Sequence, residues 1–404
     1  MAGTAQTPLD KQIAKTPSRA NPQHRGWSRT SICHVCEGGA WAGAEVQAST
    51  LLRALAKHPE VSLQAIILKE GRLAHELRSD GVVVQVVDEE GKSFPRMISE
   101  CSEFVKSRNI QILHSHSYKE NLVALMLSRI CRVPYLVRTE HGHPEPYSVV
   151  RNLKHWCVLA ADRLGANTAD QLVSVSSDLG EYWKRHVNPQ KVTVIRNGVD
   201  PERVSSRFRP DEAKQRLGIP GDSFVVGTVA RLECIKRHDL FVMTAGYLAE
   251  KIPNGNFLIV GGGRQKDSLQ RLIHDFRLQE RVSLLGERDD VYDVLRAMDV
   301  LLICSDHEGI PMVMLEAMAL GVAVVSRRVG GVSEVIQDGV NGILVPSDDP
   351  RELGRACMSI YNKPRLRKEL TQVACDEVHR KYSAEKNAET MVELYQSICY
   401  ARAQ

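Results

Sequence analysis

The 404-residue sequence is poor in aromatic residues, in net charge and in long apolar runs. Only 5% of its residues are Phe, Trp or Tyr, whereas 28 are Gly, a composition typical of parallel sheets covered by helices on both faces. Lys and Arg number 53 against 49 Asp and Glu, and a net charge of +4 is too small to indicate nucleic-acid binding. No run of about 18 apolar residues occurs, so the sequence predicts no membrane-spanning helix. We therefore expect a globular α/β protein without a nucleic-acid partner.

The sequence also has no cysteine pattern of a metal or redox site. Ten cysteines are scattered along it, and the one close pair, Cys33 and Cys36, lies in a strand-like run with no second pair at zinc-finger distance. Residues three apart in a strand point to opposite faces of the sheet. We therefore predict reduced core thiols in a cytoplasmic protein, and no bound metal.

Residues 1–28 are polar, contain several prolines and have no apolar core segment, which predicts a disordered tail rather than a signal peptide. Residues 1–200 carry 25 basic and 20 acidic groups, and residues 201–404 carry 28 and 29. The basic first half would suit peripheral contact with phosphates at the inner face of a membrane. The alternative is that these charges belong to an ordinary solvated surface.

Short apolar runs alternate with helical patterns from Thr30 onwards, and the alternation restarts after Asp200 with the run FVVGTVARL. Repeated β and α segments of this kind predict a doubly wound parallel sheet in each half. We predict an N-terminal domain over residues 29–200 and a C-terminal domain over residues 201–383. The amphipathic segment 384–404 is predicted to be a helix that braces the N-terminal domain.

Ligands of doubly wound sheets bind at the carboxyl ends of the strands. After the first predicted strand, Gly38 and Gly39 lead into a helix, where backbone N–H groups can approach a phosphate. The spacing fits a dinucleotide-binding fingerprint poorly, and a purely structural turn is an equal alternative. Arg231 and Lys236 follow the first strand of the second half and could grip a diphosphate, or could be solvated cations.

The segment from Ser305 to Met318 has the strongest pattern. Glu308 and Glu316 bracket a helix start, with Gly309 permitting a tight backbone and Pro311 suited to the first helical position. Carboxylates placed in this way can accept hydrogen bonds from the hydroxyls of a sugar or ribose. Helix capping or a surface position is the alternative.

These motifs together resemble a known family. The E-x7-E of Glu308 to Glu316 lies within HEGIPMVMLEAMALGVAVVSRRVGGVSEVI, with VARL upstream and IRNGVD at the junction of the two halves. The sequence from about residue 30 onwards thereby resembles the family 4 retaining glycosyltransferases of GT-B fold, in which two Rossmann-like domains face a cleft. One departure is Ile310-Pro311, where many members have Phe-Gly.

The resemblance implies a role for each matching residue. It implies that Arg231 and Lys236 hold the donor diphosphate, that Glu316 holds the ribose, and that Glu308 holds the donor sugar. Further donor-binding residues are implied in the glycine-rich loop of the first half and at the helix start between Glu308 and Glu316. They are Gly38, Gly39, Gly309, Ile310, Pro311 and Met312. His141, Arg231, Lys236 and Glu308 are the implied catalytic residues. His116 and His143 are candidates for the acceptor side.

The resemblance implies transfer of a sugar from a nucleoside diphosphate to a hydroxyl, with retention of configuration and without a metal or other cofactor. The cations and helix N-termini would stabilise the departing diphosphate, and Asp289-Asp290 is expected to cap a helix rather than to bind a metal. The acceptor is a sugar or a lipid-linked molecule, in cell-envelope polysaccharide or glycolipid synthesis. The donor base and sugar remain open.

Four other functions are alternatives to sugar transfer. A glycosidase would use Glu308 and Glu316 as its acid and nucleophile, but would leave Arg231 and Lys236 without a task. An NAD-linked enzyme would want a better glycine fingerprint. A sugar-nucleotide 2-epimerase of the same fold, or a non-catalytic nucleotide-sugar-binding subunit, stays open as the alternative.

Overall fold

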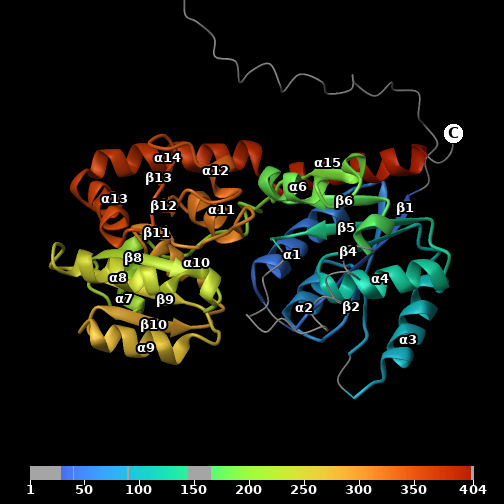
Figure 1. Cartoon of the computed structure of the whole chain (residues 1–404), viewed down its shortest axis with the longest axis horizontal. Helices are drawn as coiled ribbons and strands as arrows, with labels where there is room; N and C mark the ends of the chain where they lie inside the picture. The colour runs from blue at the N-terminus through green and yellow to red at the C-terminus, as the bar shows by residue number, and fades with distance from the viewer. Residues whose placement is uncertain (1–28, 40, 89–90, 144–164, 402–404) are drawn as a thin grey trace, which may run out of the picture.

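The computed structural model describes residues 29–39, 41–88, 91–143 and 165–401, and the predicted tail over residues 1–28 lies outside them. The chain forms two α/β lobes side by side, each built on a parallel sheet (Figure 1). The predicted fold class is confirmed by this pair of sheets.

The N-terminal lobe contains a seven-stranded sheet with the order β3-β2-β1-β4-β5-β6-β7, in which every pair is parallel. Its strands are β1 Thr30–Cys36, β2 Val61–Ile67, β3 Val83–Val86, β4 Ile112–Ser115, β5 Tyr135–Glu140, β6 Gln171–Ser174 and β7 Val192–Val194. Its described helices are α1 Gly43–Lys57, α2 Arg72–Ser79, α3 Phe94–Ser107, α4 Tyr118–Ile130 and α6 Ser177–Lys184.

The C-terminal lobe contains a six-stranded parallel sheet with the order β10-β9-β8-β11-β12-β13. Its strands are β8 Phe224–Val229, β9 Gly255–Val260, β10 Val282–Gly286, β11 Val300–Ile303, β12 Ala323–Arg327 and β13 Ile343–Val345. Its helices are α7 Pro210–Arg216, α8 His238–Ala249, α9 Lys266–Asp275, α10 Val291–Arg296, α11 Met312–Ala319, α12 Val332–Val335, α13 Pro350–Asn362 and α14 Pro364–Lys381.

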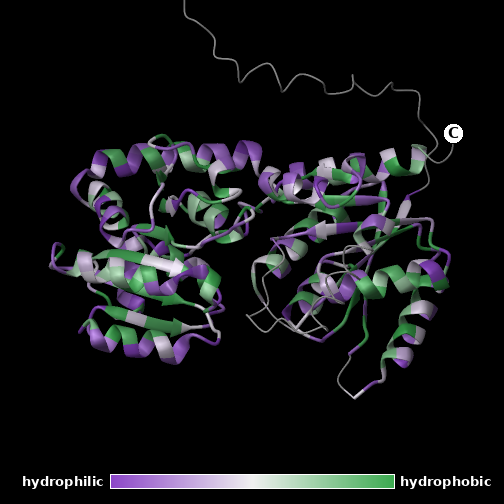
Figure 2. Cartoon of the chain, in the orientation of Figure 1, coloured by the Kyte–Doolittle hydropathy of each residue, from purple (hydrophilic) through white to green (hydrophobic). Residues whose placement is uncertain are grey.

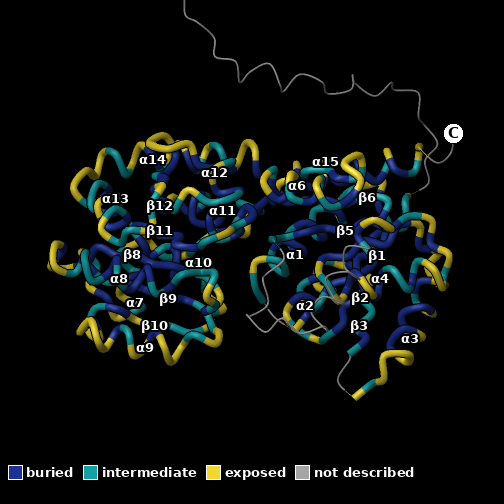
Figure 3. Tube along the Cα trace, in the orientation of Figure 1, coloured by how far each residue is buried: buried dark blue, intermediate teal, exposed yellow. Residues whose placement is uncertain are grey.

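Both sheets are buried on both faces. The strands are apolar and covered by helices, and the exposed residues lie on the outer sides of those helices (Figures 2 and 3). The two cysteines of β1 confirm the expected alternation: Cys33 packs in the core on the α3 and α4 side, whereas Cys36 packs in the core on the α1 and α15 side. Burial raises the pKa of both thiols, so they are protonated core residues.

The last helix, α15 Ala384–Ala401, carries the chain back to the first lobe. In Figure 1, α14 and α15 follow one another along the same side of both lobes, and α15 packs against α1. Val199 N–H donates to the Tyr382 carbonyl (2.8 Å) and Ala384 N–H to the Val199 carbonyl (2.9 Å), which joins the two crossings between the lobes. A side chain at Gly198 would lie 2.5 Å from the Ser383 carbonyl oxygen, so this junction requires glycine.

Among the described residues, no helix is long and apolar enough to cross a membrane.

Candidate active site

Lys236 and Glu308 form an ion pair at the strand ends of the C-terminal lobe. Lys236 lies in a short 3-10 turn after β8, Glu308 follows β11, and Nζ lies 2.7 Å from Oε1. Ser305 Oγ donates to the same Glu308 oxygen at 2.6 Å. The two side chains are only 20% and 11% exposed, so both charges are partly desolvated. The ion pair neutralises each of them with the other. The structure therefore brings two predicted site residues into direct contact.

Glu316 is the buried carboxyl of this lobe. It lies on α11 and is 5% exposed, and Tyr292 OH approaches its Oε1 at 3.4 Å. Desolvation raises the pKa of Glu316 to about 7, against the smaller lowering effects of Tyr292 and of Arg72 from the other lobe. Burial deprives the Glu316 carboxylate of hydrogen bonds from water. A ligand hydroxyl that donates to this carboxylate would replace one of those bonds and stabilise the charged form.

The backbone between the two glutamates lies against the other lobe. A Cβ at Gly309 would lie 2.8 Å from the His141 carbonyl oxygen and 2.9 Å from Val175 Cγ2. The Ile310 carbonyl accepts a hydrogen bond from Asn197 Nδ2 at 2.7 Å. Glycine at position 309 is therefore required by the close approach of the lobes.

Pro311 lies one position earlier than predicted: it is the N-cap of α11, with extended dihedrals, and Met312 is the first helical residue. Ile310 and Met312 are 2% and 4% exposed. Ile310 packs in the core of the C-terminal lobe and Met312 is buried as well, which leaves the backbone of this segment as the part that can contact a ligand.

The glycine-rich loop of the N-terminal lobe packs against the loop after β2. A Cβ at Gly38 would lie 2.1 Å from the Lys69 carbonyl oxygen, and one at Gly71 would lie 2.0 Å from the Gly38 carbonyl oxygen. A Cβ at Gly39 would meet the Lys69 side chain at 2.6 Å. Packing alone thus requires small residues here, whatever the loop binds.

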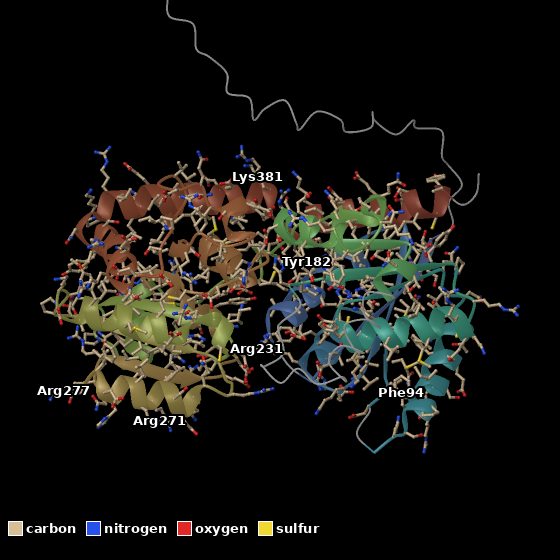
Figure 4. The ribbon with its side chains drawn as sticks, viewed as in Figure 1. Phe94, Tyr182, Arg231, Arg271, Arg277 and Lys381 are labelled. Atoms are coloured by element: carbon tan, nitrogen blue, oxygen red, sulfur yellow. The ribbon has the colours of Figure 1, made fainter. Side chains whose placement is uncertain are left out.

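Arg231 of the C-terminal lobe faces the start of α1, just after this loop. Burial raises the pKa of Glu45, in the first turn of α1, and Arg231 lowers it through its charge. Figure 4 shows Arg231 between the two lobes. The guanidinium is therefore positioned where both lobes could contact one ligand.

His141 and His116 lie in contact. His141 follows β5, and its Nε2 is 3.2 Å from His116 Nδ1. The second ring nitrogen of His116 lies 2.8 Å from His34 Nδ1, and His116 is only 5% exposed. The structure places His116 behind His141, with both of its ring nitrogens occupied by other histidines.

His143 lies where the two lobes meet. Its Nε2 is 2.8 Å from Asp178 Oδ2, and its ring centroid is 5.7 Å from that of His307 in the C-terminal lobe. The His143 side chain is 25% exposed and His116 is 5% exposed, so of the two predicted acceptor-side histidines His143 is the more accessible.

Glu334 of α12 caps the N-terminus of α6 across the lobes. Its carboxylate accepts hydrogen bonds from Ser177 N–H (2.6 Å), Ser177 Oγ (2.9 Å) and Asp178 N–H (3.2 Å), and Arg196 pairs with it at 3.0 Å. These donors are otherwise unsatisfied at a helix start. The sequence does not predict this contact, because nothing in it places α12 beside α6.

Glu120 was also missed. It lies in the first turn of α4 and is 2% exposed, and burial raises its pKa to about 7. The carboxylates of Glu37 and Glu45 act on it in the same direction, and its Oε2 has no hydrogen-bond partner among the described residues. The segment HSHSYKE, which places a carboxylate at a helix start after a strand, was the available signal.

Asp290 occupies the N-cap position of α10, in keeping with the prediction, but its side chain makes no capping hydrogen bond. Both of its carboxylate oxygens accept hydrogen bonds from Arg288, at 2.7 and 2.6 Å. This pairing lowers the pKa of Asp290. Asp289 is fully exposed and accepts a bond from Arg72 of the other lobe at 3.4 Å.

One group of described side chains could offer three ligands to a metal ion: His34, His114 and His116, whose ligand atoms lie within 4.8 Å of one another. All six of their ring nitrogens already have hydrogen-bond partners in the structure. The geometry is therefore that of a hydrogen-bonded chain.

Two facing doubly wound domains, with ionic and glycine-rich strand ends turned toward each other, define the GT-B class of protein. Sequence comparison agrees. Residues 41–203 match the model of Glycosyltransferase Family 4, and residues 210–375 match that of Glycosyl transferases group 1, so that the two matches together cover most of the chain. The chain belongs to the family 4 glycosyltransferases, which confirms the resemblance seen in the motifs.

Two relatives with named activities are each less than 30% identical to this chain. The chain is 29% identical over 256 residues to the UDP-Gal:alpha-D-GlcNAc-diphosphoundecaprenol alpha-1,3-galactosyltransferase of Escherichia coli, a match that covers 61% of this chain and 65% of that enzyme, just under two thirds. It is 26% identical to the N-acetyl-alpha-D-glucosaminyl L-malate synthase of Bacillus anthracis over 314 residues, 75% and 78% of the two chains.

Solved structures confirm the fold. HepE from Anabaena, determined in complex with UDP-glucose, superposes with a TM-score of 0.80 at 21% identity, over 91% of this chain and all of that one. Sucrose-phosphate synthase from Thermosynechococcus elongatus superposes with a TM-score of 0.76 at 20% identity, over 92% and 100% of the two chains.

Proposed function

We propose that this protein transfers a sugar from a nucleoside diphosphate donor to a hydroxyl acceptor, with retention of configuration and without a metal. The observation that carries the proposal is the Lys236–Glu308 ion pair, which lies a short distance before α11 and its buried Glu316. A cation for phosphate and two carboxylates for hydroxyls are thereby grouped on one lobe, opposite the glycine-rich loop of the other.

Each part of the donor has a matching group in this scheme. Diphosphate oxygens would take Lys236 and Arg231, ribose hydroxyls would take Glu316, and donor-sugar hydroxyls would take Glu308. Breaking the bond between the sugar and the phosphate builds negative charge on the diphosphate, and fixed cations stabilise that charge best where water is excluded. The acceptor hydroxyl would attack from the same face, with the departing phosphate oxygen taking its proton.

UDP-hexoses are the first donors to test. The E. coli relative is named for UDP-galactose, and the HepE structure contains UDP-glucose. The relatives differ in their acceptors, since their names include a diphosphoundecaprenol-linked sugar and malate. We propose the lipid-linked sugar as the acceptor class, in envelope polysaccharide or glycolipid synthesis, because the basic residues 1–200 suit an anionic membrane surface.

We also propose residues 29–200 as the acceptor domain and residues 201–383 as the donor domain. The residues proposed to bind the ribose, the phosphates and the donor sugar all belong to the lobe of the second sheet. The histidines of the proposed acceptor side belong to the lobe of the first sheet. The helix from residue 384 is then the brace on the acceptor domain, in keeping with its packing against α1.

The test is one set of incubations. Purified protein is mixed with UDP-glucose, UDP-galactose, UDP-N-acetylglucosamine, GDP-mannose or ADP-glucose, with and without a diphospholipid-linked N-acetylglucosamine, in the presence of excess EDTA. A glycosylated acceptor whose new bond keeps the anomeric configuration of the donor is the expected product. An isomerised sugar nucleotide would show a 2-epimerase, and binding without turnover would show a non-catalytic subunit. An inverted product, or activity abolished by EDTA, would contradict the mechanism.

A matched pair of variants ties the activity to the site. Lys236→Met should reduce transfer by about 100-fold or more, as expected for loss of a group that stabilises the leaving charge. Lys266→Met, which removes an exposed lysine at the start of α9, should leave transfer unchanged. Equal activity of the two variants would overturn the assignment of Lys236.

A further inference from the structure

The N-terminal lobe contains an unbroken hydrogen-bonded chain of six side chains, which we call the histidine chain: Thr139, His114, Tyr395, His34, His116 and His141. It runs from β5, through Tyr395 on α15, to the loop after β5 where His141 meets Gly309 of the other lobe. Between successive members the distances are 2.7, 2.6, 3.1, 2.8 and 3.2 Å. Side chains of β1, β4, β5 and α15, and of the loops that follow β4 and β5, thus share one polar path inside a core.

The chain lies in a place where polar groups are otherwise costly. His34 and His114 are completely buried, Tyr395 is 2% exposed, and their neighbours on the same sheet face are apolar residues such as Ile32 and Ile112. Burial lowers the pKa of His34 to about 3 and that of His141 to about 4, so these rings are neutral at pH 7. A neutral imidazole has one N–H donor and one bare acceptor nitrogen, and each bond of the chain must therefore contain one proton.

This requirement allows only two arrangements of protons in which the buried Tyr395 O–H also has an acceptor. Either every donor points from Thr139 toward His141, or every bond from Tyr395 to His141 is reversed and Tyr395 donates to His114. The Thr139 hydroxyl distinguishes them, because its sole hydrogen-bond partner among the described residues is His114 Nε2. In the reversed arrangement His114 would have to donate to Thr139, and the buried threonine O–H would have no acceptor.

We infer that the Thr139 and Tyr395 hydroxyls fix the tautomer of His141 through His114, His34 and His116, so that the proton of His141 lies on Nδ1, the ring nitrogen that points away from His116. Nδ1 of His141 has no hydrogen-bond partner in the described part of the chain. At neutral pH His141 then acts as an uncharged hydrogen-bond donor to an oxygen of the ligand, and not as a base. Tyr395, 254 positions further along the chain, is a positioning residue for it.

The tautomer itself does not depend on the proposed function, which enters only in the nature of the oxygen that His141 would contact. The experiment therefore uses the full chain without donor or acceptor. Protein labelled with 15N in its histidine rings is studied by long-range 1H–15N NMR, and the His141 signals are assigned from those missing in His141→Gln.

In the wild type we expect two widely separated ring-nitrogen shifts for His141, with the proton on Nδ1. Tyr395→Phe interrupts the chain and Thr139→Val removes the hydroxyl that gives it direction. In each variant we expect the two His141 shifts to move toward one another, because both tautomers become populated. Two variants on different elements protect the test against a loss of folding in one of them.

Tyr382→Phe is the matched control. Tyr382 is also buried, and its hydroxyl donates to the Glu334 carbonyl at 3.3 Å, outside the histidine chain. It should leave the His141 shifts as in the wild type. A wild-type proton on Nε2, or unchanged His141 shifts in both Tyr395→Phe and Thr139→Val, would overturn the inference. One equivalent of Zn²⁺ that shifts His34, His114 and His116 together would show a metal site in its place, and would overturn it as well.

Discussion

Replacing Glu316 by Gln should make the ligand-free protein more stable at pH 8 while weakening nucleotide binding. Glu316 is 5% exposed on α11, and desolvation is the main cause that raises its pKa to about 7 from 4.5. Between these two values the folded protein holds a proton that the unfolded chain has released. The stability that this proton contributes is complete below about pH 4.5 and is lost as the pH rises through about 7.

The size of the effect follows from the same two values. The interval between 4.5 and about 7, at about 1.4 kcal/mol for each pH unit, corresponds to roughly 3 kcal/mol by which the charged carboxyl destabilises the fold at pH 8. Gln keeps the oxygen that Tyr292 approaches, and burying its amide nitrogen costs about 1 kcal/mol. The variant should therefore be more stable than the wild type by about 2 kcal/mol at pH 8, and less stable by about 1 kcal/mol near pH 4.5, where only the cost of the amide remains.

Calorimetry gives the measurement. Unfolding of Glu316→Gln and of the wild type is compared at pH 4.5, 6 and 8, and a stability difference that grows with pH is expected. UDP binding is measured in parallel by titration calorimetry in buffers of different ionisation enthalpy. The wild type should release protons on binding near pH 6, because ligand hydroxyls favour the carboxylate. A variant that is less stable than the wild type at pH 8, or a difference that does not depend on pH, would refute the reasoning.

Three other predictions follow from the contacts between the lobes and from the ion pair. Gly309→Ala should weaken donor binding, because its Cβ would lie 2.8 Å from the His141 carbonyl oxygen; Gly43→Ala, which meets nothing within 4 Å, should bind as the wild type does. Glu334→Ala should lower the melting temperature and increase the radius of gyration in small-angle scattering, since it removes a helix cap between the lobes that is typically worth about 1 kcal/mol; unchanged scattering would show that this cap does not hold the lobes together. Glu308→Gln should bind UDP more tightly and UDP-glucose less tightly than the wild type, as measured by calorimetry, because it frees Lys236 but removes the proposed sugar contact.

Much of the fold was predictable because buried parallel strands leave a strong pattern. Runs such as VLLI of β11 and AVVSR of β12 are apolar throughout, and they alternate with helical segments in both halves. The restart after Asp200 was visible for the same reason. What the sequence does not contain is how the lobes meet: Glu334 on α12 and Asn197 after β7 make contacts that depend on the placement of one sheet beside the other.

The site was predictable where chemistry and local spacing coincide. Glu308, Gly309 and Glu316 belong to one strand-turn-helix segment, so their proximity followed from the sequence. The pairing of Lys236 with Glu308 was not predicted, because 72 positions separate them and a lysine side chain can reach in many directions. His116 was predicted as an acceptor-side candidate, but the HSH motif directs both of its histidines to the same sheet face, where they meet His34 and Tyr395.

The Lys236–Glu308 ion pair also neutralises both charges of the site while no ligand is bound. A diphosphate that takes Lys236 leaves a carboxylate that is 11% exposed without its cation, and an unpaired charge of that kind costs several kcal/mol. Ser305 Oγ offers Glu308 only one hydrogen bond. Sugar hydroxyls that donate to the same carboxylate would offset the loss, so that the two halves of a nucleoside diphosphate sugar together replace the ion pair. A nucleoside diphosphate without its sugar gives Lys236 a new partner but leaves Glu308 without one. The empty site would then discriminate in favour of the intact donor over the spent nucleotide, which is the direction of discrimination that repeated turnover requires.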